Sequence, residues 1–252
     1  MSAIYESEKL LAEYLLFHYG AADEILPPER SWPAGMRAAL DFPRRTVAHF
    51  SPQRVARGLD LGCAVGRSSF EMALTCDEVL GIDFSHAFIR AAEALRAGEA
   101  LVYHRLEEGA QRSALTARAP AGGDRARLRF CQGDAMNLAA DLGGFDRVHA
   151  ANLLCRLAAP QRLLERLPTL VRPGGQLVLA TPCTWLEEFT PPAHWPPAGT
   201  LAWLKASLEA SFSLEQEAEE PFLIRETARK FQWSSALVTV WRRKEGRPPD
   251  RP

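Results

Sequence analysis

The sequence has no marked excess of either charge, few cysteines and no apolar run of membrane-spanning length. Its 30 basic and 31 acidic residues give a formal net charge of −1, which argues against nucleic acid or an anionic membrane as a partner. The five cysteines form no C-x-x-C pair and no Cys/His ligand spacing, so neither a disulfide framework nor a metal site is expected. The first residues are acidic and have no apolar signal core. These absences together indicate a cytoplasmic globular protein.

The length and apolar content indicate how the chain is organised. With 252 residues, of which 47% are hydrophobic, it can bury one sizeable core. We expect a single domain over residues 1–252, with an N-terminal helical lid over 1–50 and a Rossmann-like core over 51–252. Residues 4–19 have apolar side chains at helical spacing. A helix that precedes the first strand in this way can fold over the mouth of a site at the sheet edge. A Pro-rich connector over 21–35 and a second helix over about 36–50 are predicted to follow it.

Strand and helix signals alternate along the core. Strands are predicted over 58–61, 78–83, 128–135, 145–154 and 176–181, and helices over 85–98, over 160–170 and from about residue 67. This alternation predicts an α/β fold with one doubly wound, mostly parallel sheet and right-handed crossovers. The tail, with strands near 213–224 and 231–243, predicts an antiparallel hairpin that closes the sheet. Residues 110–127 are small, basic and interrupted by Gly and Pro, which favours a solvated surface loop.

The stretch at residues 57–69, RGLDLGCAVGRSS, organises the rest of the chain. It predicts the end of a buried strand, a glycine-bearing turn at 62–66, and a helix that begins near Arg67. Such a turn exposes backbone N–H groups against which a ligand can lie. The next predicted strand ends at Asp83, 23 residues after Asp60. A carboxylate at that position can accept both hydroxyls of a ribose.

Two kinds of nucleotide site compete for this unit. A dinucleotide dehydrogenase would place glycines at 62, 64 and 67, but the chain has Ala64 and Arg67 there, and it has no P-loop Lys-Ser/Thr pair. The D-x-G-x-A-x-G spacing instead resembles motif I of the class I S-adenosylmethionine (SAM) methyltransferases. A glycine turn in some other α/β domain remains the alternative at this point.

Further residues extend the resemblance to the class I methyltransferases: Gly133-Asp134-Ala135, Asn152 at the end of the fourth strand, and Arg172-Pro173-Gly174-Gly175. The resemblance implies SAM as the cofactor and assigns residues to it by position. These are Asp60, Gly62, Cys63, Ala64, Gly66 and Arg67 beside the methionine part, Asp83 at the ribose, Phe84, Asp134 and Ala135 at the adenine, and Asn152 beside the donor methyl group.

A narrower resemblance covers nearly the whole chain. The segments YESEKLLAEYLLFHYG (5–20), LDLGCAVGRSSFEMA (59–73), AANLLCRL (150–157), TWLEEFTP (184–191) and PFLIRETARKFQWSSALVTVWRR (221–243) are similar to the 4-mercaptohistidine N1-methyltransferase family. This family forms the C-terminal domain of the ovothiol-forming sulfoxide synthase OvoA and also occurs free-standing. The resemblance implies methyl transfer to an imidazole ring nitrogen of 5-thiohistidine, or of its selenium analogue, by a stand-alone enzyme working alongside a separate synthase.

The chain departs from the family pattern near the expected substrate loop, residues 184–200. Cys183 stands where Tyr is expected, Met136 where Cys is expected, and Trp195-Pro196-Pro197-Ala198-Gly199 replaces a Trp-Leu-Gly-Gly stretch. These differences leave the acceptor open, including the choice between sulfur and selenium. A methyltransferase for another small amine, thiol or carboxylate, and a catalytically silent SAM-binding partner protein, remain alternatives. The silent protein is disfavoured because the polar residues expected at the cofactor, Asp60, Asp83, Asp134 and Asn152, are all present.

An amino-acid acceptor brings a carboxylate, an ammonium and an imidazole ring, and we expect residues for each. A bidentate arginine suits the carboxylate and an acid suits the ammonium. The candidate substrate-binding residues are Trp185, Glu187, Arg225 and Arg229, and the candidate catalytic residues are Asn152, Glu188, His18 and Tyr14. The alternatives are a solvated ion pair for each arginine and simple core packing for a lone histidine.

Overall fold

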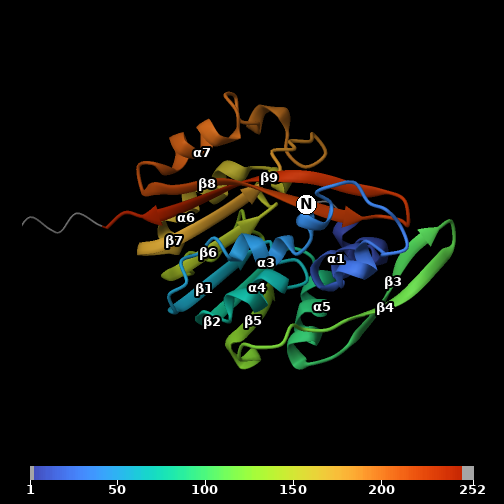
Figure 1. Ribbon diagram of the computed structural model, residues 1–252. Helices are drawn as coiled ribbons and strands as arrows, with labels where there is room; N and C mark the ends of the chain where they lie inside the picture. The colour runs from blue at the N-terminus through green and yellow to red at the C-terminus, as the bar shows by residue number, and fades with distance from the viewer. Residues whose placement is uncertain (1–2, 246–252) are drawn as a thin grey trace, which may run out of the picture.

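The computed structural model describes residues 3–245, and a seven-stranded sheet forms its centre (Figure 1). Across the sheet the strands lie in the order β5 (Leu128–Gln132), β2 (Cys76–Asp83), β1 (Val55–Leu61), β6 (Phe145–Ala151), β7 (Val171–Thr181), β9 (Phe231–Arg243) and β8 (Phe212–Arg225). The first five pair in parallel, and β9 runs antiparallel to both β7 and β8. The predicted doubly wound sheet with an antiparallel C-terminal hairpin is therefore confirmed.

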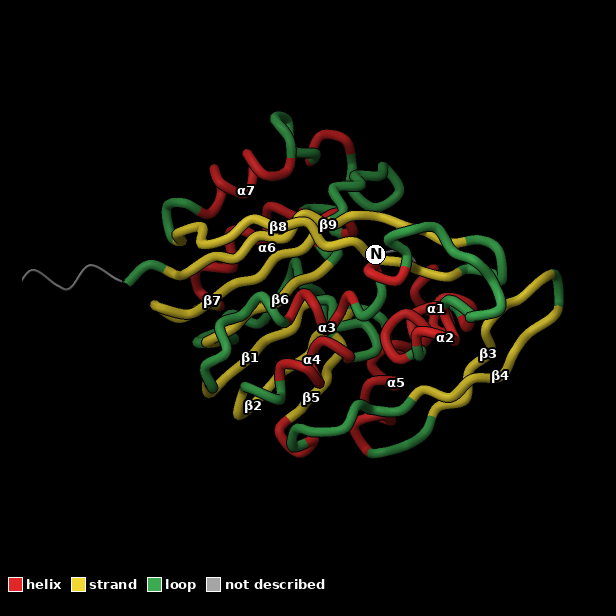
Figure 2. The backbone as a smooth tube through the Cα atoms, viewed as in Figure 1, coloured by secondary structure: helices red, strands yellow, loops and turns green. Residues whose placement is uncertain are grey.

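Helices cover both faces of the sheet, as the tube in Figure 2 shows. They are α1 (Glu8–Tyr19), α2 (Ala22–Ile25), α3 (Phe42–Val47), α4 (Arg67–Met72), α5 (His86–Ala97), α6 (Pro160–Leu170) and α7 (Thr200–Leu208), with short 3₁₀ turns at Ala3–Glu6 (η1), Arg37–Ala39 (η2), Arg125–Arg127 (η3), Leu154–Arg156 (η4) and Pro192–His194 (η5). Strand β7 shows how the faces divide. Val178 and Ala180 join the core that contains α1, α3, α4 and α5, whereas Leu177 and Leu179 join the core that contains α6 and α7.

The direction of the parallel strands determines where a site can form. β1 ends at Leu61, β2 at Asp83 and β6 at Ala151, and these carboxyl ends lie at one edge of the sheet. In open α/β sheets ligands bind outside this edge. Within residues 3–245 no helix has the length and apolar character needed to cross a membrane.

The prediction of a surface loop over 110–127 was wrong for residues 111–117, whereas residues 118–124 form no helix or strand. Strands β3 (Leu101–Glu108) and β4 (Gln111–Ala117) form an antiparallel hairpin of their own, which extends beside α1 (Figure 1). Alternation along the strands explains this arrangement, because Tyr103 and Ala117 are buried in the core while their neighbours Val102, His104 and Thr116 are exposed. The basic and small residues of the segment concealed this alternation.

Two other predicted boundaries also differ. The predicted helix over 36–50 is divided into η2 and α3, because Asp41 between them has a left-handed backbone with φ of 57° and Pro43 fits only a first helical turn. The predicted connector over 21–35 contains the short helix α2.

Candidate functional site

A cavity lies at the carboxyl edge of the sheet, between the N-terminal segment and the loops that follow β1, β2, β5 and β6. Ten of the predicted site residues line this cavity. They are Tyr14, His18, Asp60, Gly62, Cys63, Ala64, Asp83, Phe84, Ala135 and Asn152. Residues separated by more than 130 positions in the chain thus meet in one place, as the predicted topology requires.

Asp83 lies at one end of the cavity with its carboxylate held by two backbone groups. The N–H of Ala64 donates to Oδ2 at 2.9 Å and the N–H of Ser85 donates to Oδ1 at 2.8 Å. Burial raises the pKa of this carboxyl to about 6, although both N–H bonds oppose the shift. A carboxylate has about four lone-pair positions, so Asp83 can accept two further hydrogen bonds, as the hydroxyls of a ribose would require.

The turn after β1 brings the main chain close to the cavity. Gly62 has φ of 69° and Ala64 has φ of 48°, both in the left-handed region. A Cβ added at Gly62 would lie 3.1 Å from the side chain of Leu153. Glycine is therefore favoured there both by the left-handed backbone conformation and by the lack of room for a side chain. The strained Ala64 directs its N–H to Asp83, which ties the turn to the neighbouring strand end.

Asp60 is the centre of a buried polar network beneath the cavity. Its Oδ1 lies 2.8 Å from Nδ1 of His149, and its Oδ2 accepts from Oγ of Ser69 at 2.6 Å. The other ring nitrogen of His149 lies 3.0 Å from Oγ1 of Thr46. Sequence reasoning missed His149, although the register of β1 and β6 pairs it directly with Asp60 and so places both side chains on the same face of the sheet.

Three polar side chains of the cavity have capacity for a ligand. Nδ1 of His18 and Oδ1 of Asn152 are buried without a hydrogen-bond partner among the described residues. Burial lowers the pKa of His18 to about 3 and raises that of Tyr14, so both side chains are neutral near pH 7. Asn152 has φ of 54°, an unusual conformation for a residue other than glycine. Unpaired buried polar atoms of this kind indicate a polar ligand.

The N-terminal segment closes the cavity from above. Oγ of Ser85 donates to the carbonyl of Tyr5 at 2.9 Å, and the carboxylate of Glu6 accepts the N–H of His86 at 2.8 Å at the start of α5. The ring of Tyr5 lies 6.0 Å from that of Phe88 and 6.4 Å from that of Phe189, centroid to centroid. These contacts fix η1 and α1 over the strand ends.

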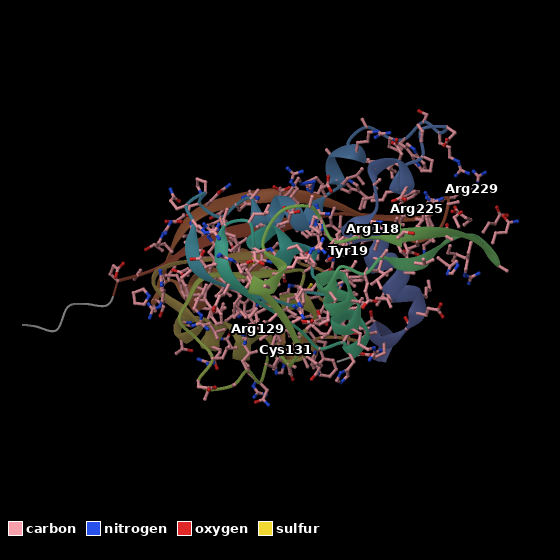
Figure 3. All side chains as sticks on the ribbon, turned by 90° about the horizontal axis from the view of Figure 1, so that it is seen from below. Tyr19, Arg118, Arg129, Cys131, Arg225 and Arg229 are labelled. Atoms are coloured by element: carbon pink, nitrogen blue, oxygen red, sulfur yellow. The ribbon has the colours of Figure 1, made fainter. Side chains whose placement is uncertain are left out.

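The structure does not bring the predicted carboxylate-binding arginines to the cavity. Arg225 is buried, donates from Nη2 to Glu107 at 2.8 Å and from Nη1 to the carbonyls of Glu24 and Ile25. Arg229 is exposed, and Figure 3 shows both arginines at the end of the molecule where the β3–β4 hairpin lies. The prediction for Arg225 is therefore corrected, because Nη1 and Nη2 hold α2 and the hairpin in place and Nε donates to the carbonyl of Thr227 at 3.1 Å.

Other predicted residues also lie outside the cavity lining. Arg67 forms an ion pair with Glu71 at 2.8 Å. Trp185 donates to Oγ1 of Thr200 and its ring contacts that of Trp203 edge-on, which places it in the core beneath α7. Four predicted residues remain. Gly66 packs against Phe130, and Asp134 accepts a hydrogen bond from the N–H of Met136. Glu187 and Glu188 are exposed.

Arg156 is a cavity residue that sequence reasoning missed. It ends η4, four positions after Asn152, and is the only lysine or arginine among the lining residues of the described chain. Its guanidinium lies over the ring of Phe189, 4.7 Å from the centroid. The segment AANLLCRL contained this residue, but nothing in its spacing showed that the side chain turns back toward the strand ends.

These features fit the cofactor that the sequence predicts. Asp83 offers the acceptor for a ribose diol, the turn at 62–64 offers close backbone approach, and Phe84 and Ala135 offer apolar walls at the Asp83 end. Asp60 and His18, whose Nδ1 has no partner among the described residues, also line the cavity, and the charge of Asp60 acts on His18. A zwitterionic methionine group requires polar partners of this kind.

The comparisons with known proteins agree with this geometry. The family described as "Methyltransferase domain" matches residues 59–177, from the middle of β1 into β7. The fold is similar to that of NodS, an N-methyltransferase from Bradyrhizobium japonicum solved with S-adenosyl-L-homocysteine (SAH). NodS is 15% identical, with 93% of this chain and 99% of NodS covered and a TM-score of 0.56.

Two further structures share the fold. A SAM-dependent methyltransferase from Methanosarcina mazei is 17% identical, with 79% of this chain and 96% of that chain covered and a TM-score of 0.53. The YcgJ protein of Bacillus subtilis is 13% identical, with coverages of 81% and 98% and a TM-score of 0.53. At these identities the likeness shows the fold alone.

Proposed function

We propose that this chain, which matches a methyltransferase domain over residues 59–177, uses SAM to methylate an imidazole ring nitrogen of 5-thiohistidine or of its selenium analogue. The observation that carries the proposal is the convergence of the segments that resemble the thiohistidine methyltransferases. Tyr14 and His18 come from the first of these segments, Asn152 from the third and Ile224 from the last, and all line one cavity. Phe189, from TWLEEFTP, contacts Tyr5 at its mouth.

When bound, SAM supplies an electrophilic methyl group on a positively charged sulfur. The residues that would hold it are Asp83, the turn at 62–64, Phe84 and Ala135, with Asp60 toward the methionine end. The contribution of the chain is then to bind the acceptor, to orient it and to exclude water, because correct placement of the two reacting atoms supplies much of the rate acceleration.

The neutral polar groups of the cavity suit an imidazole acceptor. The ring nitrogen that attacks must keep its lone pair free, so the other nitrogen must carry the proton. Oδ1 of Asn152 is an acceptor without a partner among the described residues, and we infer that it accepts this N–H and thereby orients the attacking nitrogen. Tyr14, protonated because burial raises its pKa, supplies a donor for the thiolate or selenolate of the acceptor.

The proposal predicts selectivity for the chalcogen. Plain histidine carries a C–H where the thiolate stands, so it leaves the hydroxyl of Tyr14 without its partner. A mismatch of this kind commonly costs tenfold to a few hundredfold in kcat/KM. Assays with purified protein, SAM and each acceptor, read by product mass, should show methylation of thiohistidine or selenohistidine and at least about tenfold lower kcat/KM with histidine.

A variant of Asn152 separates the role of the side chain from that of the backbone. Asn152→Gly removes the amide but keeps the left-handed conformation available, and it should lower kcat by about 100-fold while SAH binding persists. The exposed Cys131→Ser serves as a control and should retain wild-type rates. Equal kcat/KM for histidine and thiohistidine would favour a methyltransferase of broader acceptor range.

A further inference from the structure

We propose that Arg156 binds the carboxylate of the amino-acid acceptor and so selects amino acids over the corresponding amines. This inference rests on the proposed function and names the residue that recognises one end of its substrate. The sequence had suggested Arg225 or Arg229 for this role, but Arg225 is fully engaged with Glu107 and three carbonyls, and Arg229 lies outside the cavity.

The guanidinium of Arg156 is held in place by one nitrogen. Nη1 donates to the carbonyl of Thr184 at 3.2 Å and to the carbonyl of Cys155 at 3.3 Å. Nη1 also contacts Sγ of Cys155 at 3.6 Å, and the guanidinium lies beside the hydroxyl of Tyr5, where it opposes the rise in pKa of that hydroxyl. Among residues 3–245 the side chain forms no ion pair, and Nε and Nη2 donate to no backbone carbonyl and no carboxylate. Nε and Nη2 together form the edge through which arginine binds a carboxylate with two parallel hydrogen bonds.

Aromatic contacts further restrict the side chain. The guanidinium lies over Phe189, and the ring of Phe189 in turn contacts that of Tyr5. A cation that faces an aromatic ring is attracted to it, so Phe189 supports one face of the guanidinium while the Nε–Nη2 edge is left for a ligand. The site is therefore largely formed before the ligand arrives, which reduces the entropic cost of binding.

The position of Arg156 argues for the acceptor and against the carboxylate of SAM. Arg156 and Asp83 both act on the hydroxyls of Tyr5 and Tyr14, where the positive guanidinium opposes the rise in pKa that burial causes. The charges that act on His18 are instead those of Asp60 and Arg67. By geometry, Arg156 lies in the loop after β6 and contacts Thr184 and Phe189 of the segment that follows β7, whereas Asp60 is buried beneath the cavity with His149 and Ser69.

The charge balance of the cavity leads to the same residue. Its other charged groups include Asp60 and Asp83, and an acceptor carboxylate that entered beside them without a cation would meet repulsion and a large desolvation cost. No other lining residue of the described chain is a lysine or an arginine, and His18 is neutral because burial lowers its pKa to about 3. Arg156 therefore supplies the required positive charge.

The test compares two ligands that differ only in the carboxylate. Calorimetric titration of the SAH-loaded protein with 5-thiohistidine and with its decarboxylated amine should show that wild type prefers the amino acid. Arg156→Gln should weaken binding of the amino acid by about 10- to 100-fold and change binding of the amine by less than threefold. Arg156→Lys, which keeps the charge but loses the paired donors, should lie between wild type and Arg156→Gln.

Two controls keep the possible outcomes distinct. SAH affinity should stay within about twofold of wild type in Arg156→Gln, which also shows that the variant is folded, and the exposed Arg129→Gln should match wild type throughout. A fall in SAH affinity alone would assign Arg156 to the cofactor, and an equal loss for amino acid and amine would remove the carboxylate role. Absence of thiohistidine methylation by wild type would instead overturn the proposed function, and this inference with it.

Discussion

The protonation of Asp83 predicts that cofactor affinity depends on pH below neutrality. Burial raises the pKa of its carboxyl to about 6 in the protein without ligand. Ribose hydroxyls bound at Asp83 would donate hydrogen bonds to its carboxylate. A protonated carboxyl group is a weaker acceptor, and its proton occupies one of the positions at which a hydroxyl would donate. Binding of SAM or SAH should therefore favour the ionised form and weaken as the pH falls through about 6.

The size of the effect follows from the pKa. If only the ionised form binds, about one tenth of the protein is competent at pH 5 and about nine tenths at pH 7, a difference of nearly tenfold or about 1.4 kcal/mol. Three other side chains of the cavity have shifted pKa values that lie outside this range. His18 has a pKa of about 3, and burial moves the pKa values of Tyr5 and Tyr14 upward, away from this range.

The assay is calorimetric titration with SAH at pH 5, 6 and 7 in buffers of constant ionic strength. Wild type should gain roughly tenfold in affinity across the range. Asp83→Asn keeps the shape of the side chain and should bind with nearly the same affinity at all three values. The exposed Asp77→Asn should behave as wild type. The reasoning fails if wild-type affinity is flat between pH 5 and 7, or if Asp83→Asn shows the same slope.

The same change of protonation affects folding. Between the ordinary pKa of 3.8 and about 6, the native protein binds the Asp83 proton and the unfolded chain has released it. The free energy of unfolding of the ligand-free protein should therefore fall as the pH rises through this window. Asp83→Asn removes this contribution, so comparing the urea midpoints of the two proteins at pH 4.5 and 7 provides a second reading of the same pKa.

Two further predictions concern residues beneath and beside the cavity. Arg225→Ala leaves Glu107 and three carbonyls without this donor and should lower the free energy of unfolding by about 3 kcal/mol in urea titrations. The exposed Arg229→Ala should change it by less than about 0.5 kcal/mol, and comparable losses would contradict the structural role of Arg225. His149→Phe leaves Asp60 buried with only Ser69 as a partner, so both urea resistance and SAH affinity should fall. Unchanged SAH affinity would separate this network from the cofactor site.

The sheet and the place of the cavity at its carboxyl edge were predictable because their signals are local. A glycine turn, an acid at a strand end and an apolar run each lie within a few residues, and the parallel topology then brings them to one edge. Asp60 and Asp83 were found in this way. The same reasoning could not find His149, because its role depends on the register between β1 and β6, which are separated by more than 80 residues.

The acceptor end was less predictable because it is built from long-range contacts. The position of the Arg225 side chain depends on its bond to Glu107, which belongs to the β3–β4 hairpin. The basic and small residues of that segment had concealed the hairpin in the sequence. Trp185 stood in a family-like segment, yet its ring packs with Trp203 instead of facing the cavity. Arg156 reaches the cavity only because η4 turns the chain back after Asn152. Sequence patterns report which residues belong to such loops but not the direction of their side chains.

The central claim is methyl transfer to a ring nitrogen, and the position of the methyl group in the product tests it most directly. After incubation of the protein with SAM and 5-thiohistidine, fragmentation of the purified product by tandem mass spectrometry distinguishes N-methyl from S-methyl. We predict a methyl group on the imidazole ring and a free thiol, because Asn152 orients the ring nitrogen and Tyr14 holds the sulfur by a hydrogen bond. A product with the methyl group on sulfur would contradict this account.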